Sequence, residues 1–295
     1  KYFYSENPQV KIACIVEGGG RNQIKTYGDY LLNKKKLNDV SDTIIERCKT
    51  ILDIIPDCFE RTLKNHFHKN FGINLFLEKY QEYLSKVNNE ATNTGRFHNL
   101  LIDLGIYDKY KKLDEKQQAV IKDFISRLSN FEKTSIADDV QMIIRDLLFL
   151  KAENGNLNAQ KPYIVYNQGL SWEYKDLFPE DRFGINPFDI EIENSPDGRI
   201  DYDRLLYKLN RIKNTLALFD ETGTLWDKFC ENTTILINDP SNPTGFSDFN
   251  KEALIRFLKF LNKSKITLFL DEAYSDSVKV EYHELPKWRT ISRYV

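Results

Sequence analysis

The sequence has few cysteines and no long apolar run, and these two absences exclude several classes of protein. The cysteines form no C-x-x-C pair, so they predict neither a zinc site nor a disulfide framework. We therefore expect a reducing, cytoplasmic setting. No run of about 18 apolar residues could span a bilayer, and the first residues contain no apolar signal-peptide core. The cysteines are Cys14, Cys48, Cys58 and Cys230.

An excess of charge of one sign is also missing. The formal net charge is −2, and charges of both signs are interleaved along the chain. Nothing in this balance favours binding to nucleic acid or to a membrane surface. The histidines are scattered as well, and the closest pair, His66 and His68, would point to different faces of a helix. We therefore predict no metal site.

What the chain does contain is two short apolar runs, each followed by a cluster of polar residues. Residues 233–237 precede D-P-S-N-P-T-G at 239–245, and residues 266–270 precede D-E-A-Y at 271–274. Such runs are typical of buried parallel strands. Residues 249–263, between them, have the apolar spacing of one helical face. The segment therefore predicts strand, turn, helix and strand, as in an α/β protein.

Polar residues just past the carboxyl ends of parallel strands face the crevice where α/β proteins bind ligands. We therefore expect Asn242, Asp271 and Tyr274 to converge on one site. An alternative stays open for each cluster taken alone. N-P and T-G pairs are ordinary turn chemistry, and an Asp after a strand often caps the next helix.

The two clusters resemble the fold-type-I pyridoxal phosphate-dependent enzymes of the aspartate aminotransferase (class I/II aminotransferase) family. The large domain of that family carries N-P-x-N-P-T-G and later D-E-x-Y, and here Asp239 stands in place of the first Asn. The resemblance implies an α/β domain whose mostly parallel sheet is flanked by helices. It also implies pyridoxal 5'-phosphate as cofactor, an amino acid and a 2-oxo acid as small-molecule partners, and a homodimer.

By the same resemblance, three residues would hold the cofactor ring. Pyridoxal phosphate withdraws electrons while its ring nitrogen is protonated, so a buried carboxylate must hold that proton. Asp271 would take this role. Asn242 and Tyr274 would donate hydrogen bonds to the O3′ oxygen without adding a formal charge.

Two further cofactor contacts follow from the resemblance. The family places an aromatic ring after the strand that we predict at 162–166, and Trp172 is the first candidate, with Tyr166 second. The cofactor phosphate would bind at the start of the helix predicted over 139–150, where Ser135 supplies a hydroxyl. Core packing of the indole and an ordinary helix cap at Ser135 explain the same residues, so both alternatives stay open.

The first part of the chain gives a different pattern. We predict that residues 1–130 form a mainly helical accessory region with one possible strand at 10–16, and that 131–295 form the cofactor-binding large domain. One helix should be capped by Ser41 or Asp42 and end before Pro56, and another should cover 115–128. The region names no ligand, and a separate functional domain is an open alternative.

A glycine turn, Gly18-Gly19-Gly20, follows the possible first strand. Such a turn can bind an anion through its backbone N–H groups. It is also similar to the oxyanion loop G-G-G-x-R-G of patatin-type lipases, but Arg21 follows the glycines directly. No G-x-S-x-G nucleophile motif occurs downstream, so lipase chemistry is not predicted.

The family's catalytic lysine, which holds the cofactor as a Schiff base, would lie beyond Val295. Lys279 and Lys287 are too close to Asp271 and lack the small-residue context of that motif. We therefore expect the chain to lack the catalytic lysine and the C-terminal part of the large domain. Two other functions stay open, a non-catalytic or truncated module used for binding or scaffolding, and an amino-acid decarboxylase or lyase.

Overall fold

The computed structural model describes residues 12–15, 20–33, 40–63, 97–99, 101–102, 105–128, 162–166, 172–179, 182–185, 192, 200–238 and 251–271. The chain divides into two compact units. The first comprises residues 1–37, 157–210 and 227–295, and the second comprises 38–156 and 211–226. None of the described helices is long and apolar enough to cross a lipid bilayer.

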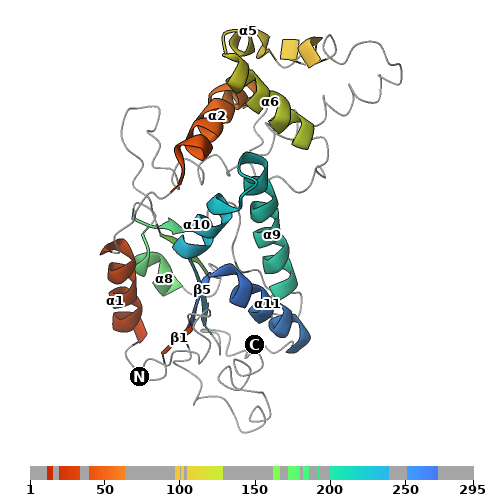
Figure 1. Ribbon diagram of the computed structural model, residues 1–295. Helices are drawn as coiled ribbons and strands as arrows, with labels where there is room; N and C mark the ends of the chain where they lie inside the picture. The colour runs from red at the N-terminus through yellow and green to blue at the C-terminus, as the bar shows by residue number, and fades with distance from the viewer. Residues whose placement is uncertain are drawn as a thin grey trace. The chain divides into compact units, whose positions relative to one another are not determined.

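The first unit is built on a parallel sheet of five strands in the order β1-β5-β4-β2-β3. Figure 1 labels two of them, β1 and β5. Every neighbouring pair is parallel, and β5 and β4 lie between β1 and β2. The predicted α/β fold with a parallel sheet is therefore confirmed. The strands are β1 (Ile12–Ile15), β2 (Tyr163–Val165), β3 (Gly184–Ile185), β4 (Thr233–Asn238) and β5 (Thr267–Asp271).

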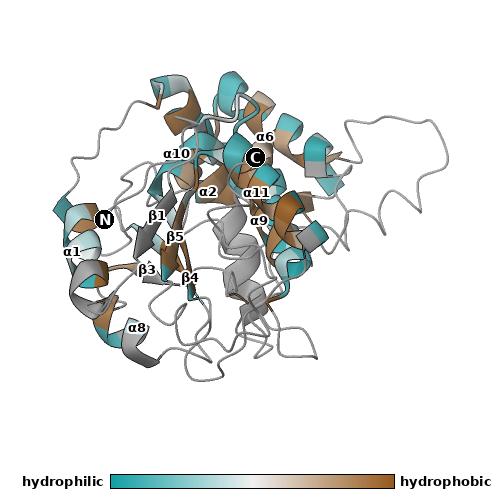
Figure 2. Ribbon diagram, turned by 90° about the horizontal axis from the view of Figure 1, so that it is seen from below, coloured by the Kyte–Doolittle hydropathy of each residue, from teal (hydrophilic) through white to brown (hydrophobic). Residues whose placement is uncertain are grey.

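The strands β4 and β5 are buried on both faces, as expected for apolar runs in the middle of a parallel sheet. Figure 2 shows both strands mostly in brown, the colour of apolar residues. Their register pairs Leu236 with Phe269 and Asn238 with Asp271. Because side chains alternate between the faces of a strand, Phe269 and Asp271 belong to the same face of β5.

The helices α1 (Gly20–Asn33) and α8 (Trp172–Leu177) lie on that face of the sheet (Figures 1 and 2). Tyr27 of α1 reaches the sheet, where its hydroxyl and that of Thr234 share a hydrogen bond of 3.0 Å. Gly28 allows close packing, because a Cβ atom there would lie 3.2 Å from the ring of Phe178. The core cluster on this face contains Ile24, Ile164, Tyr166, Tyr174, Phe178, Phe183, Leu236 and Phe269.

Helix α11 (Lys251–Ser264) lies on the opposite side of the sheet (Figures 1 and 2). Its buried apolar stripe follows the predicted spacing and consists of Leu254, Phe257, Leu258 and Leu261. Helix α9 (Tyr202–Phe219) begins beside it, since the rings of Tyr202 and Phe257 lie 5.3 Å apart. Asp201 caps α9 by accepting a hydrogen bond of 2.8 Å from the backbone N–H of Arg204. Helix α10 (Thr224–Asn232) leads into β4.

The second unit is helical in its described part, with α2 (Asp42–Leu63), α5 (Tyr107–Tyr110) and α6 (Glu115–Leu128). The bounds of α6 agree with the prediction. Its start is a capping box, in which the Asp114 carboxylate accepts from the backbone N–H of Gln117 and the Gln117 side chain accepts from that of Asp114. The prediction that α2 ends before Pro56 was wrong. A proline removes only one helical hydrogen bond, and here the helix continues beyond it.

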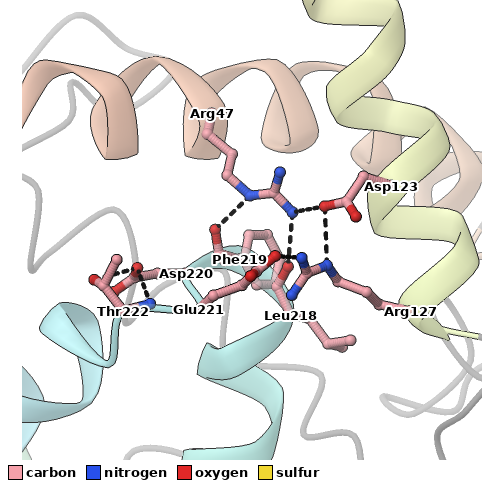
Figure 3. Close-up of polar contacts among 8 residues, drawn as sticks. All are labelled: Arg47, Asp123, Arg127, Leu218, Phe219, Asp220, Glu221 and Thr222. Atoms are coloured by element: carbon pink, nitrogen blue, oxygen red, sulfur yellow. Dashed lines mark hydrogen bonds and ion pairs between the residues drawn. The ribbon is translucent and has the colours of Figure 1, made fainter.

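Arg47 of α2 connects α6 to the end of α9 (Figure 3). Its Nε–H donates to the carbonyl of Phe219 at 2.8 Å, and a terminal N–H donates to the carboxylate of Asp123 at 2.6 Å. Arg127 binds the same carboxylate at 2.9 Å and pairs with Glu221. These contacts provide partners for helix-terminal carbonyl groups that would otherwise have none in the helix.

The sheet also includes a strand from the start of the chain. The strand β1 lies within the predicted range 10–16, pairs with β5, and groups with α1 in the first unit. The predicted boundary between 1–130 and 131–295 falls among residues outside the described ones. The short strand β3 was not predicted.

Candidate functional site

The candidate site is the carboxyl edge of the sheet around Asp271, the last residue of β5. In the register of the sheet, Ile15 of β1 and Asn238 of β4 are the partners of Asp271, so three strands end side by side. Only 7% of Asp271 is exposed. A carboxylate so deeply buried is costly unless it has partners, and in an open α/β sheet this edge is where ligands bind.

Tyr174 provides one partner of this carboxylate. Its phenol O–H donates to Oδ2 of Asp271 at 2.8 Å. Tyr174 belongs to α8 and is itself only 5% exposed. Its ring meets that of Tyr166 edge to face, with centroids 5.5 Å apart and an angle of 82° between the planes. The core of the first unit thus fixes the direction from which the hydroxyl approaches.

Asn238 holds the ends of the two central strands together. Its side-chain amide donates to the backbone carbonyl of Asp271 at 3.1 Å. Asn238 is the last residue of β4 and directly precedes the 239–245 cluster. The bond therefore fixes the point at which both polar clusters begin.

The chemistry of these groups fits a cofactor that carries a protonated nitrogen. Asp271 is acceptor-only when ionised, and one of its side-chain donors is the neutral phenol of Tyr174. A neutral donor adds no positive charge beside the carboxylate, so this contact does not compete with a cation for it. The protonated ring nitrogen of pyridoxal phosphate is such a cation.

Of the five predicted cofactor-binding side chains, the structure describes only that of Asp271. Trp172 is the first residue of α8, and its side chain lies outside the described part. Asn242, Tyr274 and Ser135 also lie outside it. Their convergence with Asp271 stays a prediction. Tyr166, the second candidate for the stacking ring, is fully buried in the core cluster.

Sequence reasoning missed Tyr174 and Asn238. Tyr174 follows the predicted cofactor contact Trp172 by two positions, and Asn238 directly precedes Asp239, the first residue of the 239–245 cluster. The missing signal was spatial, since the Tyr174 bond joins residues 97 positions apart. Within the described residues, no group of three or more His, Cys, Asp or Glu side chains could hold a metal ion.

The fold and the site define an α/β protein whose polar groups gather at the carboxyl edge of a parallel sheet. Residues 174–288 match the family model for aminotransferase class I and II, and this range includes Tyr174, Asn238 and Asp271. The resemblance read from the sequence is therefore confirmed, and members of this family generally use pyridoxal phosphate. Comparison with curated proteins and with solved structures gave no match.

Proposed function

We propose that the protein is a pyridoxal phosphate-dependent aminotransferase that moves an amino group between an amino acid and a 2-oxo acid. The observation that carries this proposal is the buried carboxylate of Asp271 at the carboxyl end of β5, inside the range matched by the family model. A cytoplasmic homodimer is part of the proposal, in keeping with the family resemblance and with the buried free thiols of Cys48 and Cys230.

Each of the predicted cofactor-binding residues would have a definite task. Asp271 would hold a proton on the ring nitrogen through an ion pair in a water-poor site. Asn242 and Tyr274 would donate hydrogen bonds to O3′, and Trp172 would cover the face of the ring. The bound cofactor supplies the electron-withdrawing ring that makes the substrate's Cα–H acidic. A decarboxylase or lyase would use the same groups, so reaction type needs its own measurement.

The phosphate of the cofactor has two candidate positions. Ser135 is the position implied by the family resemblance, and it falls in the range of the second unit. The glycine segment Gly18-Gly19-Gly20 is the other position. In the sequence it follows β1, whose last residue Ile15 pairs with Asp271, and Gly20 is the first residue of α1. Affinities for pyridoxamine with and without its phosphate, measured in Ser135→Ala and Gly19→Ala, would decide between the two positions.

Binding of pyridoxamine 5'-phosphate to the chain tests the proposal. This probe has no aldehyde, so it cannot react with surface lysines. Titration calorimetry should show saturable binding, and Asp271→Asn should weaken it at least about tenfold, because a charge-assisted pair is lost. Asp203→Asn, which changes an exposed carboxylate of the same unit, is the matched control. Equal affinity in the Asp271→Asn variant would disprove the ring-nitrogen role.

Turnover separates the remaining functions. An aminotransferase should pass the amino group of an isotopically labelled amino acid to a 2-oxo acid, whereas a decarboxylase should release carbon dioxide. In a protein that carries the Schiff-base lysine, tight binding without either reaction would identify a binding module. These assays leave the Asp271 test unaffected, because that test measures binding alone.

A further inference from the structure

We infer that Tyr174 is a positioning residue, which orients the Asp271 carboxylate toward the ring nitrogen of the cofactor. The inference rests on the proposed function, since it concerns the same site. It is carried by the phenol-to-carboxylate hydrogen bond of 2.8 Å between two buried side chains from different elements.

The surroundings of Tyr174 suit this task because they restrict its motion. The residue belongs to the core cluster with Tyr166 and Phe178. The ring of Tyr166 meets that of Tyr174 edge to face and lies 6.5 Å from that of Phe178. A ring packed in a core has few accessible rotamers. The hydroxyl therefore reaches Asp271 from a fixed direction.

Asp271 is thus held at two points from two directions. Tyr174 binds its side chain from α8, while Asn238 binds its backbone carbonyl from the neighbouring strand β4. The backbone contact fixes where the residue lies, and the phenol fixes the rotation of the carboxylate. An ion pair with a planar ring nitrogen depends on that rotation, because hydrogen bonds weaken steeply when they are misaligned.

The neutrality of the phenol matters as much as its position. A lysine or arginine at this place would pair with the carboxylate and compete with the protonated ring nitrogen. The phenol donates a hydrogen bond to the carboxylate without placing a positive charge beside it. Without the phenol, the carboxylate should be misaligned more often, so its ion pair should weaken and the ring nitrogen should lose its proton at lower pH.

The test compares two probes that differ only at the ring nitrogen. One is pyridoxamine 5'-phosphate, and the other is its analogue with a C–H group at that position. Wild-type protein should prefer the nitrogen-containing probe by about tenfold or more, as expected for a charge-assisted hydrogen bond. Tyr174→Phe, which removes one oxygen atom, should lose most of this preference. Tyr27→Phe is the matched control, because it removes a phenol that binds Thr234 on the same face of the sheet.

A spectroscopic titration gives an independent readout. The absorbance of bound pyridoxamine 5'-phosphate reports the protonation of its ring nitrogen, and this transition should move to lower pH in Tyr174→Phe. Incorporation of 3-fluorotyrosine at position 174 keeps the shape of the residue and makes its hydroxyl a stronger donor. It should increase the preference for the nitrogen-containing probe, and it decides the question if Tyr174→Phe does not fold.

The outcomes distinguish this inference from the proposed function. If Tyr174→Phe weakens both probes equally, or keeps the full preference, Tyr174 only packs in the core and the inference is wrong. The proposed function would survive that result as long as Asp271→Asn abolishes the preference. If Asp271→Asn keeps the preference, the proposed function itself fails.

Discussion

Arg47 donates to three acceptors in the described part of the second unit. Its side chain is 18% exposed and donates to the carboxylate of Asp123 and to the carbonyls of Leu218 and Phe219 (Figure 3). The guanidinium is a planar fork that can serve several acceptors at once, whereas an ammonium is a single point of donation. Replacement by lysine should therefore leave at least one partly buried acceptor without a donor.

We predict that Arg47→Lys lowers the free energy of unfolding by about 1–3 kcal/mol, the usual cost of an unsatisfied buried polar group. Urea denaturation followed by circular dichroism measures this change. Lys49→Met is the control, because it removes an exposed pair with Glu46 on the same helix and should cost less than about 1 kcal/mol. Equal effects of the two substitutions would contradict the role assigned to Arg47.

Asp123 gives this network a dependence on pH. Burial by itself would raise the pKa of its carboxyl, but the hydrogen bonds and charges of Arg47 and Arg127 outweigh burial, so the pKa is lowered from 3.8. A carboxyl whose pKa is lower in the folded state contributes stability above its unfolded pKa and loses that contribution as pH falls through the folded pKa.

We therefore predict that wild type is more stable than Asp123→Asn at pH 6 and that the difference shrinks below about pH 4. Urea midpoints measured at several values of pH test this expectation. The side chain is 40% exposed, so solvent screening keeps the effect small. A difference that grows on acidification would show that the sign of the pKa shift is wrong.

At the scale of elements, the end of α11 contains a conformational conflict. Lys265 directly follows this helix with a φ of 60°, in the left-handed region that glycine tolerates best. Its contacts with Asp227 and Glu231 are long, at 3.5 and 3.4 Å, and all three side chains are exposed. Such pairs contribute little, so the backbone cost should dominate the effect of a substitution.

We predict that Lys265→Gly raises the free energy of unfolding by up to about 1 kcal/mol, because it removes the cost of a side chain at positive φ. Gly223→Ala is the converse test. Gly223 has a φ of 80°, and a Cβ added there would meet nothing within 4 Å beyond its chain neighbours, so the alanine should destabilise by about 1 kcal/mol through backbone conformation alone. Thermal unfolding of both variants gives the comparison. A loss of stability in Lys265→Gly would mean that the ion pairs outweigh the backbone cost.

The elements also show how far the sequence could predict the structure. The range of α6 and the runs of β4 and β5 were predictable, because apolar periodicity is local and a buried face imposes it. The position of β1 beside β5 was not, since strand order depends on contacts between residues far apart in the chain. The carboxylate of Asp271 was predicted from its place after a strand, but its partner Tyr174 was not, because no local pattern joins α8 to β5.

At the scale of the whole molecule, the chain divides into two compact units, and the candidate site falls in one of them. Asp271, Tyr174 and Asn238 all fall in the first unit, whereas α2 and α6 fall in the second. A ligand that binds only the folded form of one unit stabilises that unit by mass action. A second unit that opens independently gains nothing from the ligand.

We predict that pyridoxamine 5'-phosphate at one hundred times its dissociation constant slows hydrogen exchange in β4 and β5 by up to about one-hundredfold. Exchange in α6 should stay unchanged. Mass spectrometry of peptides that cover Thr233–Asn238, Thr267–Asp271 and Glu115–Leu128 measures both effects in one experiment. Asp271→Asn should remove the protection at the same ligand concentration. Equal protection of α6 would show that the two units unfold as one, and absence of protection in β4 and β5 would place ligand binding away from this edge of the sheet.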